Sequence, residues 1–179
     1  VKTGNPVRQN IIAPDIDRQA AYDYFRLERD KKTILVVGGS LGAKTINDSI
    51  ALHIDKLLQT DCQIVWQTGK NYFAEIKAKI SEQGIKFTTD SANPVYAKRM
   101  FVSDFISQMD YAYNVADLVI SRAGASSVSE LCLLGKPAIL VPSPNVAENH
   151  QYHNAMALVA KNAALLVEDA EAVDNLLPQ

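Results

Sequence analysis

Short apolar runs alternate with amphipathic segments along most of this chain. The apolar runs cover residues 33–37, 62–67, 99–102, 118–120, 138–141 and 164–167, and such runs are typical of strands buried on both faces of a parallel sheet. Apolar residues recur at helical spacing over 43–58, 72–83, 109–115, 127–134 and 149–161. This alternation predicts the α/β class, with helices on both faces of a parallel β-sheet.

The two ends of the chain depart from this pattern. Residues 1–30 begin with loop-forming residues and continue as a polar, charged segment, so we expect an entry loop and linker there and one domain over 31–179. Residues 84–98 predict an irregular connection. The chain begins with Val1 and stops soon after an apparent helix start at 171–177, which predicts a domain from a longer protein with a truncated carboxyl end.

Composition narrows the class of protein. The 179 residues are 47% hydrophobic, enough for one good core, and a net charge of -2 gives no general attraction to nucleic acid or to a membrane surface. No apolar run approaches a membrane span, and no signal peptide is visible. Cys62 and Cys132 lie in separate apolar segments, which predicts two buried thiols in a cytoplasmic protein.

The segment SRAGASSVSE, residues 121–130, carries the most chemical information. An apolar run leads into it and a helical pattern follows, so its small residues lie where a buried strand turns into a helix. Backbone amides and the helix dipole favour an anion at such a turn. Glu130 follows one turn into the helix, within reach of a sugar hydroxyl; the alternative is a solvated or capping carboxylate. The segment predicts a pocket for a nucleoside diphosphate.

A second turn of this kind, GGSLGA at residues 38–43, follows the first apolar run. It lacks the G-x-G-x-x-G spacing, and the next strand ends without an acidic residue for a ribose, so NAD is not expected. Lys44 and Thr45 do not fit P-loop spacing either. Ser40 is therefore predicted to offer a hydroxyl to a phosphate. Both turns follow the carboxyl ends of strands, where open sheets bind ligands.

Several other polar residues are candidates. Gln151 and Asn154 are expected to bind sugar hydroxyls, because amides both donate and accept. Arg122 has two open interpretations, a phosphate ligand or a partner for a carboxylate. From spacing alone, Arg8 is a surface residue. His150 and His153 have no third ligand at metal spacing, and the D-x-D segment at 15–17 is interpreted as a surface loop, so no metal is expected.

Four motifs in order give a resemblance to a known family. They are TGNPVR at 3–8, GGSLGA at 38–43, SRAGA through Ser129-Glu130, and Gln151-Tyr152 with Asn154-Ala155. Together they resemble the carboxyl-terminal half of the MurG family, bacterial transferases that form the peptidoglycan precursor lipid II. The resemblance implies a GT-B fold, in which two Rossmann-like domains face each other, with this chain as the second, donor-binding domain.

The resemblance also implies an activity. The complete enzyme transfers N-acetylglucosamine from UDP-N-acetylglucosamine to the C4 hydroxyl of the muramyl sugar of lipid I, with inversion and without a metal cofactor. The general base, the lipid I contacts and the membrane contacts are expected in a missing amino-terminal domain, on the cytoplasmic face of the plasma membrane. The fragment alone is expected to bind donor without turning it over.

By motif position, the resemblance gives several residues a role. Arg8 and Ser40 contact the diphosphate, in place of the surface role that spacing favours for Arg8. Ile106 meets the uracil through its backbone. Glu130 holds the ribose hydroxyls and Gln151 those of N-acetylglucosamine, while the phosphates lie on the amides of Ala125, Ser126 and Ser127. His150 stands where relatives often carry glutamine.

Two other classes remain open from the sequence. One is another GT-B enzyme that uses a UDP-sugar, such as a UDP-N-acetylglucosamine 2-epimerase or a glycolipid transferase. The other is a non-catalytic nucleotide-binding module. The motif at 3–8 and the Gln151-Tyr152 pair favour the lipid II-forming transferase over both.

Overall fold

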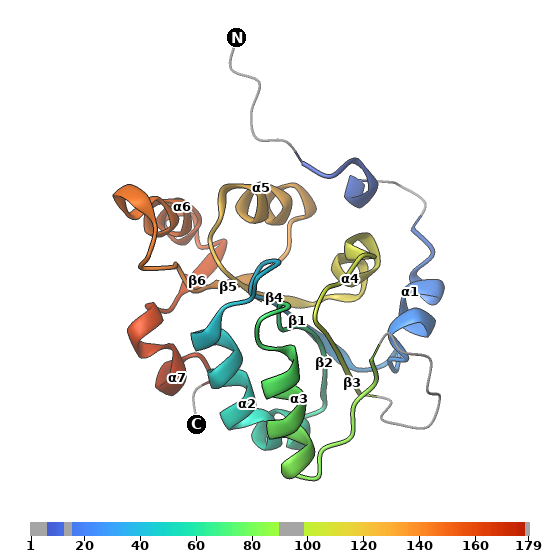
Figure 1. Ribbon diagram of the computed structural model, residues 1–179. Helices are drawn as coiled ribbons and strands as arrows, with labels where there is room; N and C mark the ends of the chain where they lie inside the picture. The colour runs from blue at the N-terminus through green and yellow to red at the C-terminus, as the bar shows by residue number, and fades with distance from the viewer. Residues whose placement is uncertain (1–6, 13–15, 90–98, 178–179) are drawn as a thin grey trace.

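The computed structural model describes residues 7–12, 16–89 and 99–177 and places six strands in one parallel sheet (Figure 1). The strands are β1 (Lys32–Val37), β2 (Cys62–Gln67), β3 (Met100–Ser103), β4 (Leu118–Ser121), β5 (Ala138–Leu140) and β6 (Ala164–Leu166). Their order is β3-β2-β1-β4-β5-β6, with every neighbouring pair parallel. The chain order reverses between β1 and β4, and this switch point is where open α/β sheets bind ligands.

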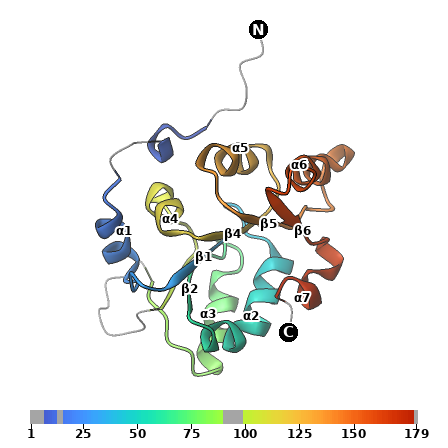
Figure 2. The same cartoon turned by 180° about the vertical axis from the view of Figure 1, so that it is seen from behind.

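Helices cover both faces of the sheet (Figures 1 and 2). One face carries η1 (Gln9–Ile12), α1 (Arg18–Phe25), α4 (Met109–Val115), α5 (Ala125–Leu134) and α6 (His150–Val159). The other carries α2 (Lys44–Gln59), α3 (Phe73–Glu82) and α7 (Ala172–Asn175). Two 3-10 helices, η2 (Ala147–Asn149) and η3 (Asp169–Glu171), precede α6 and α7.

The core consists of two apolar clusters separated by the sheet. Leu35 belongs to the cluster under α4 and α5, and its neighbour Val36 belongs to the cluster under α2. Because successive side chains of a strand point to opposite faces, a strand covered on both sides must be apolar at every position. This is the reason that the apolar runs predicted the strands, and the predicted fold class is confirmed.

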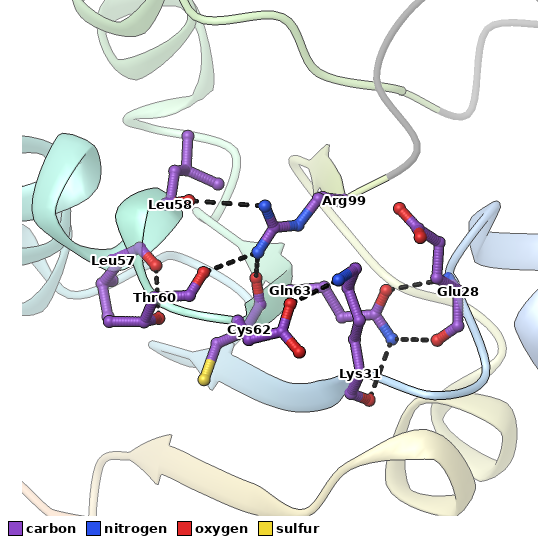
Figure 3. Close-up of polar contacts among 9 residues, drawn as sticks. Glu28, Lys31, Leu57, Leu58, Thr60, Cys62, Gln63 and Arg99 are labelled. Atoms are coloured by element: carbon purple, nitrogen blue, oxygen red, sulfur yellow. Dashed lines mark hydrogen bonds and ion pairs between the residues drawn. The ribbon is translucent and has the colours of Figure 1, made fainter.

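The amino-terminal edge of the sheet is closed by side-chain hydrogen bonds (Figure 3). The terminal nitrogens of Arg99 donate to three carbonyl groups from the end of α2 to the start of β2, at 2.7 to 3.4 Å. These are the carbonyl groups of Leu58, Thr60 and Cys62. Gln63 is fully buried; its Oε1 accepts from the Glu28 amide at 2.8 Å and its Nε2 donates to the Glu28 carbonyl at 2.7 Å. These bonds join the connections that enter β1, β2 and β3.

Helix α1 is the main departure from the sequence prediction, which placed only a linker there. Asp17 caps the helix, accepting from the Gln19 amide at 2.8 Å. Phe25 is buried, with its ring centroid 4.9 Å from that of Phe101 on β3. An eight-residue helix shows little periodicity and takes its stability from such tertiary packing. The division at residue 30 stays a prediction, although Phe25 and Tyr22 belong to the core cluster of the sheet.

The prediction of two buried thiols is wrong for Cys132. Both cysteines are free, but Cys62 is only partly buried and Cys132 is exposed. Helix α5 buries Leu131 against the sheet and turns Cys132 and Leu133 towards solvent. An apolar run in a helix therefore does not bury every member. Residues 3–6 of the first motif and Asp15 lie outside the described residues.

Candidate functional site

The two glycine-rich turns lie side by side at the carboxyl-terminal edge of the sheet. The strands that lead into them are neighbours, with Val37 of β1 opposite Ser121 of β4. A cavity of about 470 Å³ lies between the turns, lined by glycines of both and by Ser127, Gln151 and Asp169. The convergence of both turns on one edge, predicted from the sequence, is confirmed by this shared cavity.

Close packing requires glycine at two positions of the turns. At a third position, neither packing nor backbone conformation requires it. A Cβ on Gly42 would lie 2.2 Å from the Thr68 carbonyl oxygen, and one on Gly38 would lie 2.5 Å from the Ala43 nitrogen. Gly124 has an ordinary φ of −64°, and a Cβ there would meet no described protein atom within 4 Å. Gly124 also lines the cavity, so its missing side chain leaves room there.

Helix α5 directs its amino terminus towards this site. It begins at Ala125, two residues before the predicted start, and Gly124 at the N-cap position has no side chain to cap the first turn. The amides of Ser126 and Ser127 lie in that turn, before the first intrahelical bond, which the Val128 amide makes to Gly124 at 3.0 Å. The terminus therefore offers amide donors and the positive end of the helix dipole to an anion.

Glu130 is buried rather than solvated, with 4% of its surface exposed. Its Oε2 accepts a hydrogen bond from the Tyr113 hydroxyl at 3.0 Å, and its Oε1 lies 3.6 Å from Nε of Arg8, whose side chain is half exposed. The alternative interpretation of Glu130 as a solvated or capping carboxylate is wrong. Burial, and then the charge of Glu130, raise the pKa of Tyr113 well above its usual value.

Arg122 pairs with a carboxylate in this structure, as one of its two interpretations predicts, and it also lines the cavity. Its guanidinium forms an ion pair with Asp169 of η3 and donates to the Val141 and Pro142 carbonyls at 3.1 and 3.2 Å. Asp169 also accepts from the Thr45 hydroxyl at 3.0 Å. Asp169 was not identified as a site residue from the sequence. The feature that could have indicated it is an acidic residue shortly after the last strand, β6.

Helix α6 brings Gln151 to the cavity. The Gln151 Oε1 accepts from the Ser143 amide at 2.9 Å. Asn154, the second candidate for sugar hydroxyls, donates to the Ala123 carbonyl at 3.1 Å and so braces the second glycine turn. His150 is exposed, with Nδ1 2.8 Å from the Ala147 carbonyl oxygen.

Ile106 lies in the loop after β3 and is buried. Its amide donates to Oε1 of Gln67 at 2.8 Å, and Nε2 of Gln67 donates to the Gly39 carbonyl at 3.0 Å. Gln67 therefore joins the loop of Ile106 to the first glycine turn, a role without any local sequence signal.

The eight predicted site residues divide into two groups. Ser127 and Gln151 line the cavity, whereas the other six residues are not part of its lining. The second group consists of Arg8, Ser40, Ile106, Ala125, Ser126 and Glu130. Among the described residues, no three or more His, Cys, Asp or Glu side chains form a group that could hold a metal ion. The described part of the chain also contains no helix with the length and apolar character needed to cross a membrane.

Comparison with known proteins gives consistent results. Residues 33–179 match the model of the glycosyltransferase family 28 C-terminal domain. Two curated relatives are named UDP-N-acetylglucosamine--N-acetylmuramyl-(pentapeptide) pyrophosphoryl-undecaprenol N-acetylglucosamine transferase. That of Parabacteroides distasonis is 52% identical over 99% of this chain and 45% of its own length, and that of Phocaeicola vulgatus is 51% identical over 99% and 44%. The chain thus spans somewhat less than half the length of these relatives.

A solved structure agrees with the relatives. The crystal structure of MurG from Acinetobacter baumannii is 31% identical, with a TM-score of 0.67, over 93% of this chain and 44% of that one. The resemblance to the MurG family that the four motifs indicated is confirmed by these comparisons. The chain therefore belongs to the domain family named glycosyltransferase family 28 C-terminal domain.

Proposed function

We propose that this chain is the donor-binding domain of an inverting transferase that moves N-acetylglucosamine from UDP-N-acetylglucosamine to the C4 hydroxyl of lipid I, giving lipid II for peptidoglycan synthesis. The observation that carries the proposal is the cavity between two glycine turns on neighbouring strands, beside the uncapped first turn of α5. The substrates are those in the names of the relatives, which are more than twice as long as the region that this chain matches.

The diphosphate binds at the amino terminus of α5 in this proposal. A Cβ on Gly124 would meet no described protein atom within 4 Å, and in this proposal the phosphates bind there to the amides of Ala125, Ser126 and Ser127, in the first turn of α5. Ser40 adds a hydroxyl from the first turn. Arg8 moves from Glu130, 3.6 Å away in this structure, to the phosphates when the donor binds. An exposed side chain changes partner at little cost.

The rest of the donor follows from the position of the diphosphate. Glu130 accepts from the ribose hydroxyls, and the backbone of Ile106 meets the uracil through its carbonyl, because Gln67 already binds its amide. Gln151 uses its amide NH₂ on the N-acetylglucosamine hydroxyls, because its oxygen accepts from Ser143.

Catalysis in this proposal is largely electrostatic. Negative charge grows on the β-phosphate as the sugar leaves, and preorganised amides, the α5 dipole and Arg8 stabilise it without a metal. The general base and the acceptor site belong to the amino-terminal part of the full-length protein. The relatives act on an undecaprenol-linked acceptor, so that part also meets the cytoplasmic face of the plasma membrane.

Calorimetric titration of this chain with UDP, UDP-N-acetylglucosamine and ADP tests the proposal. We expect both uridine ligands to bind in preference to ADP, with the same affinity in EDTA as in Mg²⁺, and Glu130→Ala to weaken UDP by about tenfold. Equal affinity for ADP, or loss of binding in EDTA, would contradict it.

An activity assay provides the second test. The isolated chain should not transfer sugar to a lipid I analogue, whereas the full-length protein should. Transfer by the 179 residues alone would contradict the assignment of the general base to the other domain. Donor binding without transfer by the full-length protein would indicate a non-catalytic nucleotide-binding module.

A further inference from the structure

The carboxylate of Glu130 is held by a tyrosine from a different helix. Tyr113 lies on α4 and is 5% exposed, and its hydroxyl donates to Oε2 of Glu130 at 3.0 Å across the contact with α5. The ring belongs to the apolar cluster on this face of the sheet. A packed ring has one orientation, so it places the hydroxyl at one fixed point.

The two oxygens of Glu130 have different surroundings. Oε2 receives the buried Tyr113 hydroxyl, whereas Oε1 faces the half-exposed side chain of Arg8 at 3.6 Å. The open side of the carboxylate is therefore the side of Oε1. A ligand hydroxyl that reaches Glu130 from solvent meets this oxygen.

Tyr113 is suited to act only as a donor here. Burial and the neighbouring Glu130 raise the pKa of its hydroxyl, so the phenol stays protonated at physiological pH. A carboxylate has only acceptors to offer, so the proton of this bond comes from the phenol. The bond is buried, and the low local dielectric strengthens it.

We propose that Tyr113 is a positioning residue that orients Glu130 and reserves Oε1 for the hydroxyls of the donor ribose. The inference rests on the proposed function, because it assumes that Glu130 binds the ribose. Tyr113 itself does not touch the donor. Its loss should weaken recognition of the ribose hydroxyls selectively, because Glu130 could then adopt other rotamers.

The test compares UDP with 2′,3′-dideoxyuridine diphosphate, by calorimetry, in the wild-type chain and in Tyr113→Phe. The wild type should prefer UDP, and the variant should lower this preference by about fivefold while its affinity for the dideoxy ligand stays the same. Tyr22→Phe is the matched control: Tyr22 is also buried in the same cluster, and its hydroxyl accepts from Arg18 at 3.2 Å. This control should leave the preference unchanged.

A double-mutant cycle separates positioning from a general structural effect. In a Glu130→Ala background, Tyr113→Phe should cause no further loss of UDP affinity, because Tyr113 acts through Glu130. A second variant, Tyr113→4-aminophenylalanine, keeps the inference testable even if Tyr113→Phe does not fold. Its NH₂ group donates from nearly the same place, so it should retain the wild-type preference.

The outcomes distinguish this inference from the function on which it rests. A wild-type chain that does not bind UDP, or binds both ligands equally, overturns the ribose role of Glu130 and the inference with it. A wild-type chain that prefers UDP, together with a Tyr113→Phe variant that keeps the full preference, overturns the inference alone. Loss of preference in the 4-aminophenylalanine variant does so too.

Discussion

Two glutamines at opposite ends of β2 use the same chemistry for different purposes. Gln63 near the amino end binds the amide and the carbonyl of Glu28, at 2.8 and 2.7 Å. Gln67 at the carboxyl end binds the amide of Ile106 at 2.8 Å and the carbonyl of Gly39 at 3.0 Å. Both side chains are buried. Each one joins a strand to the backbone of neighbouring connections.

What differs is the space that the connections enclose. At the amino edge, Gln63 and Arg99 draw the connections onto the protein itself (Figure 3). At the carboxyl edge, Gln67 joins the Ile106 loop to the first glycine turn, and Gly39 of that turn lines an open cavity. In this sheet, the amino edge is closed by hydrogen bonds within the protein, whereas the carboxyl edge leaves space for a ligand. Substitutions at the first edge should change only the free energy of unfolding, whereas those at the second can change ligand affinity as well.

The largest effect is expected where the carboxyl edge also depends on tight packing. Gly42→Ala would place a Cβ 2.2 Å from the Thr68 carbonyl oxygen, at a φ of +88°, so the first glycine turn must move away from the backbone at Thr68 and Gly69. We expect it to lower the free energy of unfolding, measured in urea, by about 4 kcal/mol or more. Gly39→Ala is the control, with the same φ but an open position; it should cost only about 1–2 kcal/mol. Equal losses in the two variants would argue against close packing of Gly42 on Thr68 and Gly69.

Much of the fold was predictable because its determinants are local. Continuous apolar runs mark strands covered on both faces, and the predicted strand over 62–67 and helix over 109–115 agree with β2 and α4. The edge that carries the site followed from strand direction alone. Helix α1 was missed because it depends on Phe25 packing against Phe101, which follows it by more than seventy positions.

The contacts within the site were less predictable. Tyr113 with Glu130, Gln67 with Gly39, and Arg122 with Asp169 are separated by 17, 28 and 47 positions. Hydrogen bonds at such separations leave no periodic pattern in the sequence. Residue types and motif order predicted which side chains matter, whereas their partners required the three-dimensional arrangement.

The second prediction tests the amino edge. Gln63→Ala leaves the half-buried backbone of Glu28 without two hydrogen-bond partners and empties a fully buried position, so we expect a loss of about 3 kcal/mol in the free energy of unfolding. The UDP affinity of the folded chain should not change. Gln83→Ala is the control: this exposed glutamine donates to the Ala51 carbonyl at 3.2 Å and should cost less than about 0.5 kcal/mol. Reduced UDP affinity in Gln63→Ala would remove the distinction between the two edges.

The third prediction concerns the matching residue at the carboxyl edge. Gln67→Ala removes two hydrogen bonds and should lower the free energy of unfolding by about 2 kcal/mol. Unlike Gln63→Ala, it should also weaken UDP by about fivefold, because the Ile106 loop and the Gly39 turn lose their common support. Urea unfolding and calorimetry on the same preparation measure both. If Gln67→Ala changes stability but not UDP affinity, Gln67 has only the structural role of Gln63.

The smallest effect on stability, and the sharpest test of the ligand edge, is expected at Gly124. Its φ of −64° suits alanine, and a Cβ would meet no described protein atom within 4 Å. Gly124→Ala should therefore change the free energy of unfolding by less than about 0.5 kcal/mol, since lower unfolded-state entropy offsets a poorer N-cap. If a phosphate occupies that space, UDP should bind about tenfold more weakly. Uridine, without phosphates, should bind the variant and the wild type equally. Unchanged UDP affinity would mean that the diphosphate lies elsewhere on this edge, because no contact among the described residues requires glycine at position 124.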